Sequence, residues 1–391
     1  MRRTRRSPPA KPVTLHTIAR RCRVAKSTVS LALRGDPRVQ PRTAKRIRAV
    51  AAKLGYNPAQ HESARRLALR KYGGRALSKV VGFLCPEQGY TFPFYSRLLQ
   101  GALEGFSPAG FNVVAGTFLR RPSGEIEPPT SLEHLLSRGD LDALIYYSDE
   151  LTFKPILSRA RRNPGFQDRP VLSLLFPASG CSCVLADEED GGFRAAAHLL
   201  DLGHRHLLQF GTQYSAKEGP LSAARWGGVR RALASRQLDP DRHLLFLAAT
   251  RKWVDPIALP HALREIETSR AAESENGAAL LEYLREHREI TAILAQNDSI
   301  ALHVWHALYQ AGLHVPADLS LTGFDDTDPM LDEGGRNLLT TVRIPLLDAG
   351  REAAQLVTRR VTGELEHDQT VRLPTEFVAR ASTATPRVRA L

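Results

Sequence analysis

Four polar residues stand where they could bind a small polar molecule: Asp187, Arg225, Asn297 and Asp325. The two aspartates and the asparagine lie at the ends of short apolar runs typical of buried strands, and Arg225 begins a helical stretch. A carboxylate accepts hydrogen bonds from hydroxyl groups, and a guanidinium donates them as a rigid fork. This set therefore predicts a site for a sugar-like or other polar ligand. The neighbouring Asp298 and Asp326 are expected to be helix caps.

A second set of polar residues lies on one short predicted helix, residues 25–33. Lys26, Ser27 and Ser30 point outward with Leu31, whereas Val29 points inward. Lysine can donate to guanine or to phosphate, and serine can bond to either kind of group. The helix therefore has the side chains needed to read DNA bases.

Two further predicted helices surround this one. The first follows Thr14, whose hydroxyl can cap it, and the third begins at Pro41 and ends at Gly55. Thr28 and Thr43 lie near helix starts, where hydroxyl groups and backbone amides can bind phosphate. Two short helices joined by a tight turn and packed by a third make a helix-turn-helix unit.

The charge distribution agrees with a nucleic-acid partner at this end of the chain. Residues 1–79 contain 22 lysines and arginines but only two acids, a net charge of +20, whereas the remaining residues carry −7. A basic excess confined to one region is the electrostatic footprint of nucleic-acid binding.

The larger part of the chain alternates apolar runs with amphipathic helices. Runs at 80–84, 111–115, 143–147 and 171–175 form one series, and the alternation restarts after Asp187. Such alternation predicts parallel sheets covered by helices, here in two α/β lobes. Ligands of open parallel sheets bind beyond the carboxyl ends of the strands, where the four polar residues lie.

Several function classes are not expected. No apolar run approaches the roughly 18 residues of a membrane helix, so no membrane partner is predicted. The basic start has no apolar segment behind it and is not a signal peptide, and four cysteines are too few for a disulfide framework. We expect buried structural cysteines, a cytoplasmic, nucleoid-associated protein, and no metal or cofactor. Motifs such as Gly-x-Ser-x-Gly are absent, so we expect no enzyme.

Longer motifs carry a specific resemblance. Residues 14–35, with Thr28-Val-Ser inside them, and the later Leu54-Gly-Tyr-Asn-Pro58 resemble the DNA-binding headpiece of the LacI/GalR (lactose-repressor/galactose-repressor) family. The stretches 93–101, 197–205, 295–298, 312–326 and 339–343 are similar to its effector domain. The resemblance implies a small all-α helix-turn-helix headpiece and an α/β periplasmic-binding-protein-like (type I) domain of two lobes with three crossovers.

The resemblance also implies partners. These are double-stranded, near-palindromic operator DNA bound by a homodimer, and a small-molecule effector that modulates operator affinity, with repression as the expected output. The expected DNA-binding residues are Thr14, Lys26, Ser27, Thr28, Ser30, Leu31, Arg34, Thr43, Tyr56, Asn57, Arg65 and Leu67. Either Arg65 or Leu67 is the minor-groove contact of a hinge helix. The expected effector-binding residues are Phe94, Tyr95, Phe176, Asp187, Arg225, Trp226, Asn297 and Asp325.

The predicted domain limits follow from these patterns. Residues 1–13 are a disordered basic tail, 14–57 the DNA-binding domain, 58–78 a hinge, and 79–391 the effector-binding and dimerisation domain. Its first lobe comprises 79–183 and 344–366, and its second lobe comprises 184–342 and 370–384. The alternative function is a cytoplasmic solute-binding sensor that does not bind DNA, which would show no DNA binding even at low salt.

Overall fold

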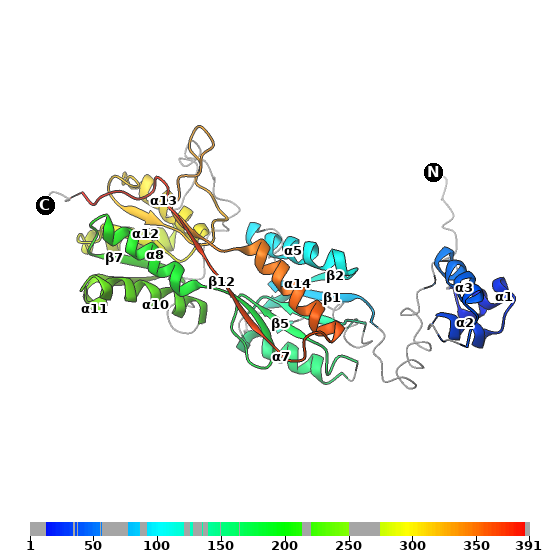
Figure 1. The fold of residues 1–391 in the computed structure, drawn as a ribbon. Coiled ribbons are helices and arrows are strands. Elements are labelled where there is room, and N and C mark those ends of the chain that lie inside the picture. The colour runs from blue at the N-terminus through cyan, green and yellow to red at the C-terminus, as the bar shows by residue number, and fades with distance from the viewer. Residues whose placement is uncertain are drawn as a thin grey trace. The chain divides into compact units, whose positions relative to one another are not determined.

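The chain forms two compact units, Met1–Ser78 and Lys79–Leu391, in a computed structural model (Figure 1). The described residues are 13–33, 36, 38–54, 56, 77–86, 92–120, 126–127, 135, 140–148, 150–163, 165–212, 220–249 and 274–387. No helix within these ranges is long and apolar enough to cross a membrane.

The described residues of the first unit form the three predicted helices: α1 (Leu15–Cys22), α2 (Lys26–Leu33) and α3 (Pro41–Lys53). Their apolar residues recur every three or four positions and therefore meet in one core. The fully buried members of this core include Ile18, Val29 and Ile47. We call this unit the headpiece.

Local interactions fix the ends of α1. Thr14 caps the helix and forms a reciprocal capping box with Thr17. Arg23 ends the helix in the left-handed conformation, with φ of 49°, and its amide bonds back to the carbonyl groups of Ala19 and Arg20. This conformation turns the chain into α2 within three residues.

The first lobe of the large unit is built on a seven-stranded sheet with strand order β12-β6-β5-β4-β1-β2-β3. All neighbouring strands are parallel except the short β3. The strands are β1 (Val80–Pro86), β2 (Asn112–Arg120), β3 (Ile126–Glu127), β4 (Ala143–Tyr146), β5 (Val171–Leu174), β6 (Ser182–Ala186) and β12 (Thr370–Leu373). Its helices are α5 (Pro93–Phe106), the 3-10 turn η3 (Ser107–Ala109), α7 (Glu150–Arg161) and α14 (Leu346–Thr362).

The second lobe is built on a four-stranded parallel sheet with order β10-β9-β7-β8. Its strands are β7 (Leu207–Thr212), β8 (Leu244–Ala249), β9 (Ala292–Ala295) and β10 (Ser320–Thr322). Its helices are α8 (Glu188–Asp201), α10 (Pro220–Ser235), α11 (Pro240–His243), α12 (Glu275–Glu286) and α13 (Asp298–Gln310). The two α/β lobes agree with the fold predicted from the sequence.

The chain passes between the lobes three times. It crosses after β6, again between β11 (Thr341–Arg343) and α14, and a third time between β12 and β13 (Glu376–Val378), while β11 and β13 pair antiparallel. Figure 1 shows the C-terminal segment, in red, running from one lobe to the other. The predicted lobe limits need correction, because β6 and β12 both belong to the first sheet and not to the second lobe.

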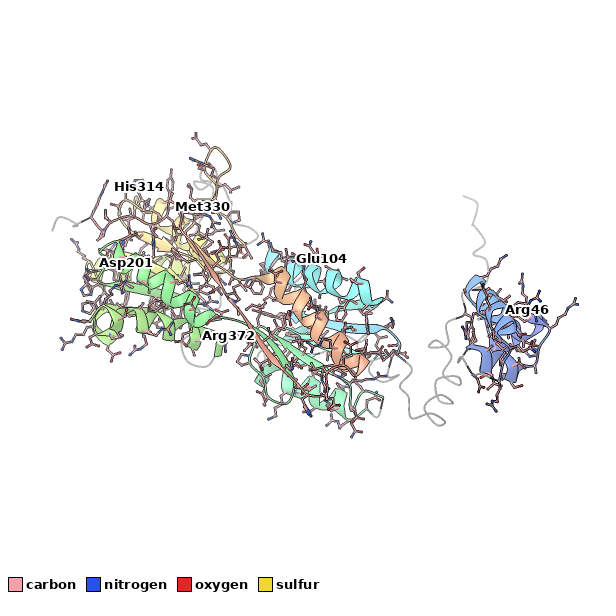
Figure 2. The ribbon with its side chains drawn as sticks, viewed as in Figure 1. Arg46, Glu104, Asp201, His314, Met330 and Arg372 are labelled. Atoms are coloured by element: carbon pink, nitrogen blue, oxygen red, sulfur yellow. The ribbon has the colours of Figure 1, made fainter. Side chains whose placement is uncertain are left out.

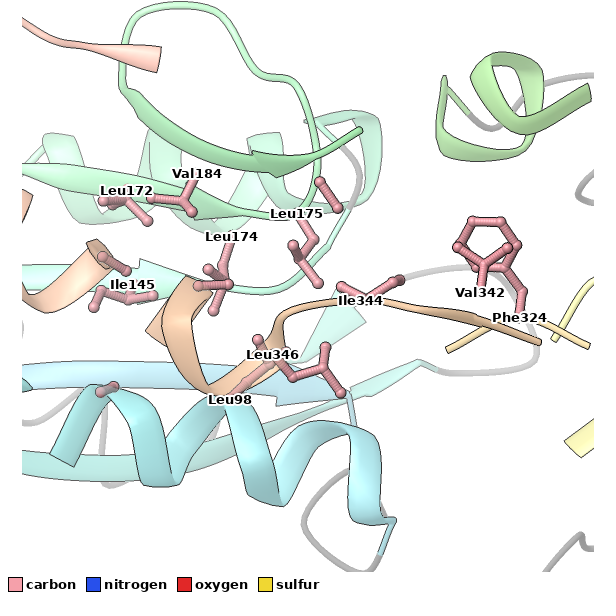
Figure 3. Close-up of a cluster of buried hydrophobic side chains, with 14 of the residues drawn as sticks. Leu98, Ile145, Leu172, Leu174, Leu175, Val184, Phe324, Val342, Ile344 and Leu346 are labelled. Carbon is pink, nitrogen blue, oxygen red and sulfur yellow. The ribbon is translucent and has the colours of Figure 1, made fainter. Parts of the chain in front are cut away.

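Apolar side chains continue from one lobe into the other along the middle crossing. Figure 3 shows Leu174 and Leu175 of the first lobe, Ile344 on the crossing, and Val342 and Phe324 farther along. All five are buried in the same core cluster. The crossing is therefore packed, which fixes where the two lobes meet.

Two tightly packed helix pairs stabilise the lobes. In the second lobe α8 packs on α10, and a Cβ added to Gly192 or Gly228 would overlap a backbone carbonyl oxygen of the partner helix. In the first lobe α5 packs on α14. Both pairs also carry ion pairs, Asp201 with Arg236 and Glu104 with Arg351, and the two acids are labelled in Figure 2.

Candidate functional site

The outward surface of α2 has the character needed for a base-reading helix. Lys26 and Ser27 are exposed at its N-terminal end, whereas Val29 and Ala32 are fully buried against α1 and α3. Thr28, Ser30 and Leu31 are half-buried. The buried residues fix the rotation of the helix, so Lys26 and Ser27 must face solvent.

Arginines of α3 tie the helices of the headpiece together. Arg46 donates to the carbonyl group of Cys22 at the end of α1, and Arg48 donates to that of Ala32 in α2. Arg46, labelled in Figure 2, is exposed all the same. These guanidinium groups cap carbonyl groups while adding positive charge to the surface.

The remaining predicted DNA-binding residues have mixed positions. Thr14 caps α1 and is exposed, and Thr43 lies half-buried in the first turn of α3. Tyr56 packs in the headpiece core with 9% exposure, so its ring is mainly structural. The predicted contacts Arg34, Asn57, Arg65 and Leu67 lie outside the described residues.

In the large unit, four aromatic side chains of the first lobe contact one another. Phe94 and Tyr95 begin α5, Tyr147 follows β4, and Phe176 follows β5. Their rings meet edge to face with centroids 4.9–5.5 Å apart. All four residues are half-buried.

Three charged side chains come from the second lobe: Glu188 begins α8, Arg225 lies in α10, and Asp325 follows β10. The Nε and Nη2 atoms of Arg225 donate to Glu188 Oε2 at 2.9 and 2.6 Å, and its Nη1 donates to the carbonyl group of Gln296. Its Nη2 lies 4.0 Å from Asp325 Oδ1. The guanidinium plane also covers the ring of Phe324. These three residues and the four aromatic residues form what we call the interlobe cluster.

The two halves of the cluster affect each other electrostatically. Burial raises the pKa of Tyr147, and the charges of Tyr95, Asp325 and Glu188 raise it further. Burial likewise raises the pKa of Tyr95, with contributions from Cys85 and Asp325. The pKa of Asp325 is well above its usual value because of burial, although Arg225 opposes this shift. Its backbone has φ of 103°, an uncommon conformation that is often found at functional sites.

Comparisons with known proteins agree with both parts. Residues 14–59 match the family "Bacterial regulatory proteins, lacI family", and residues 196–383 match a "Periplasmic binding protein-like domain". Catabolite control protein A of Priestia megaterium is 27% identical over 374 residues, which cover 95% of this chain and 99% of that protein. The lacI family model therefore matches the part of the chain whose residues resemble the LacI/GalR headpiece.

Solved structures of LacI/GalR regulators share the fold. A Lac repressor dimer bound to operator and an anti-inducer has a TM-score of 0.63 at 21% identity, covering 96% of this chain and 100% of its own. A complex of the regulator CelR with cellobiose has a TM-score of 0.60 at 23% identity, covering 95% and 99%. The prediction of a helix-turn-helix headpiece with a periplasmic-binding-protein-like domain is confirmed.

Three of the predicted effector residues have structural roles in this chain. Asp187 caps α8 and Asn297 caps α13, each accepting a backbone amide hydrogen bond. Trp226 is 8% exposed in the main core cluster. Because its ring packs on apolar side chains, Trp226 does not suit the predicted role of stacking on a ligand.

The cap predictions for Asp298 and Asp326 are wrong. Asn297 is the cap of α13, and Asp298 is buried inside, where it accepts from Thr341 Oγ1 and the Thr327 amide. Asp326 binds two arginines, Arg343 and Arg380, at 2.7 Å each. Both carboxylates hold neighbouring segments together instead of ending a helix.

Two members of the interlobe cluster, Glu188 and Tyr147, were not predicted from the sequence. Each lies directly beyond a strand, Tyr147 after β4 and Glu188 one residue farther past β6 than Asp187. The same rule that selected Asn297 and Asp325 would have found them had it been applied to every strand.

Other candidate chemistry is weak in the described part of the chain. No group of three or more histidine, cysteine or acidic residues is placed there to hold a metal ion. All four cysteines are free and buried, which agrees with the structural role expected for them.

Proposed function

We propose that this chain is a repressor that binds near-palindromic operator DNA as a homodimer and responds to a small polar effector in the interlobe cluster. One observation carries the proposal: α2 exposes Lys26 and Ser27 at its leading end while its opposite side is locked into the core of a strongly basic headpiece. Such a helix can enter the major groove with its N-terminal end first.

Related structures support the partners. The Lac repressor of similar fold was solved as a dimer on its operator, and CelR was solved with cellobiose. In this chain the interlobe cluster joins aromatic and charged groups from both lobes, so a ligand there would touch both. A ligand that favours one arrangement of the lobes would change operator affinity, typically by 1–3 kcal/mol in coupling free energy.

The decisive experiment is selection of bound sequences from random DNA with the purified full chain. We expect enrichment of a near-palindromic site with half-sites one helical turn apart. Lys26→Ala should weaken binding to the selected site by about 1–3 kcal/mol and relax the preference at one base pair of each half-site. Lys53→Ala, which removes an exposed lysine at the far end of α3, is the matched control.

Failure to enrich any sequence at low salt would contradict the proposal. It would favour the alternative of a ligand sensor that does not bind DNA.

A further inference from the structure

We propose that the ligand of the interlobe cluster is a small organic cation whose ammonium group sits between the Asp325 carboxylate and the rings of Tyr95 and Tyr147. The inference rests on the effector site of the proposed function and adds the charge of the ligand. It follows from how the charged groups of the cluster are already paired.

Arg225 is already engaged by the protein itself. Two of its nitrogens donate to Glu188, the third donates to the Gln296 carbonyl group, and its plane lies over the ring of Phe324 at 3.4 Å from the centroid. Glu188, which is 2% exposed, cannot turn to solvent. The positive charge of the guanidinium group is therefore already neutralised by Glu188. Its nitrogens are engaged within the protein and are not placed to bind an anionic ligand.

The other nearby arginines are also engaged. Arg343 pairs with Asp326 and Glu376, and Arg380 pairs with Asp326. Arg97 of α5 donates to the backbone carbonyl group of Asp326. None of these four contacts is with the Asp325 carboxylate.

Among the described residues, Asp325 thus has no nearby positive charge that is not already paired. Within the described residues no group donates a hydrogen bond to its carboxylate, and its nearest cation is the already paired Arg225 at 4.0 Å. Glu188 and Asp328 add negative charge around it. An anionic ligand would be repelled here, whereas a cationic ligand would supply the counter-charge that favours the ionised form of this carboxyl group.

The aromatic rings complete a site for a cation. The centroids of Tyr95 and Tyr147 lie 5.0 Å apart with nearly perpendicular rings, and the charge of Asp325 acts on both hydroxyl groups. Aromatic faces beside a carboxylate attract ammonium groups through the ring quadrupole and the negative charge together. A single ammonium group would interact with both the aromatic rings and the carboxylate.

The test measures binding of single compounds to the full chain by thermal shift and then by calorimetry. The cations are glucosamine, choline and putrescine, the neutral compounds are glucose, ribose and cellobiose, and the anions are glucuronate and glucose 6-phosphate. We expect at least one cation to bind at least tenfold tighter than every neutral or anionic compound. Tighter or equal binding of a neutral or anionic compound, or no binding by any of the cations, would overturn the inference.

A variant then locates the site. Asp325→Asn keeps the size of the side chain and should lower the affinity for the cation at least tenfold. The melting temperature of the free protein should change little. Asp190→Asn is the control, since Asp190 lies on α8 and pairs with Arg194 away from the cluster. Unchanged cation binding by Asp325→Asn would place the cation elsewhere and refute the assignment.

DNA binding distinguishes a failure of the inference about ligand charge from a failure of the proposed function. If a neutral or anionic compound binds and alters operator affinity, the proposed function stands and the charge inference fails. If no operator is selected at all, the proposed function fails whatever the ligand.

Discussion

Arg23 carries the clearest local strain in the headpiece. Its left-handed backbone forms the turn between α1 and α2, although a side chain in that conformation costs about 1–2 kcal/mol compared with glycine. Its amide hydrogen bonds to Ala19 and Arg20 hold the turn in place. The turn is thus maintained by its neighbours and not by the preference of its own residue.

Replacing Arg23 by glycine should stabilise the headpiece. We expect a gain of about 0.5–1 kcal/mol, because the steric cost disappears while glycine adds some entropy to the unfolded chain. Hydrogen exchange of the α1 amides in the full chain would measure it. Arg23→Ala removes the same charge but keeps the Cβ, so an equal gain in that variant would disprove the steric explanation.

Asp298 makes stability depend on pH. Burial raises its pKa to about 8, although hydrogen bonds from Thr341 and Thr327 oppose the shift. The unfolded chain releases this proton near pH 4, whereas the folded chain keeps it until about pH 8. The contribution of Asp298 to the free energy of unfolding therefore falls as pH rises between these values, and is constant above them.

Asp298→Asn should reduce this loss of stability. Urea unfolding at pH 5 and pH 8 should show a smaller decrease for the variant than for the unchanged protein, because an amide does not ionise. Asp241→Asn, at an exposed carboxylate, should leave the difference between the two pH values as it was. A decrease of unchanged size in Asp298→Asn would mean that Asp298 is ionised in the folded protein at both pH values.

For single residues, the sequence predicted which residues lie at the candidate site better than it predicted what each of them does there. Arg225 and Asp325 do lie together, as expected from the strand end before Asp325 and the helix that carries Arg225. The engagement of Arg225 by Glu188 could not be foreseen, because it depends on how α8 and α10 pack. The burial of Tyr56 and Trp226 likewise depends on tertiary contacts that one sequence position does not reveal.

Among the elements, the α8–α10 pair sets the position of Glu188 relative to Arg225. The helices approach closely because Gly192 and Gly228 have no side chains at the contact. Gly227, next to Gly228 on the same helix, faces open space. The two adjacent glycines therefore offer a matched comparison.

Gly228→Ala should lower the free energy of unfolding by about 1–3 kcal/mol, because its Cβ would overlap the carbonyl oxygen of Glu189. Gly227→Ala should instead raise it by about 0.5–1 kcal/mol, as alanine favours the helix. Thermal or urea unfolding of the two variants would measure both changes. Equal effects at the two positions would show that close helix packing is not what selects glycine at 228.

Most elements followed from hydrophobic periodicity. The predicted helix 25–33 is Lys26–Leu33, and the apolar runs 143–147 and 171–175 contain the strands Ala143–Tyr146 and Val171–Leu174. The limits of the lobes did not follow, because β12 lies far along the chain from the strand it joins, β6. Periodicity reports which face of an element is buried, but not which sheet receives it.

For the whole molecule, the concentration of charge in residues 1–79 predicts a steep dependence of DNA binding on salt. A dimer making 6–10 phosphate contacts should lose about 10³–10⁵ in affinity between 50 and 200 mM salt. Fluorescence anisotropy with the selected site would give the slope, and a random duplex would give the non-specific component. Affinity that does not change with salt would contradict a basic headpiece on a phosphate backbone.

The three passages between the lobes also govern the order in which the protein can assemble during synthesis. The strands of the second sheet lie between Leu207 and Thr322, so that sheet can close while the rest of the chain is still being made. The first sheet must wait for Thr370–Leu373, which pairs beside β6. The lobe that begins first along the chain is therefore the last to be completed on the ribosome.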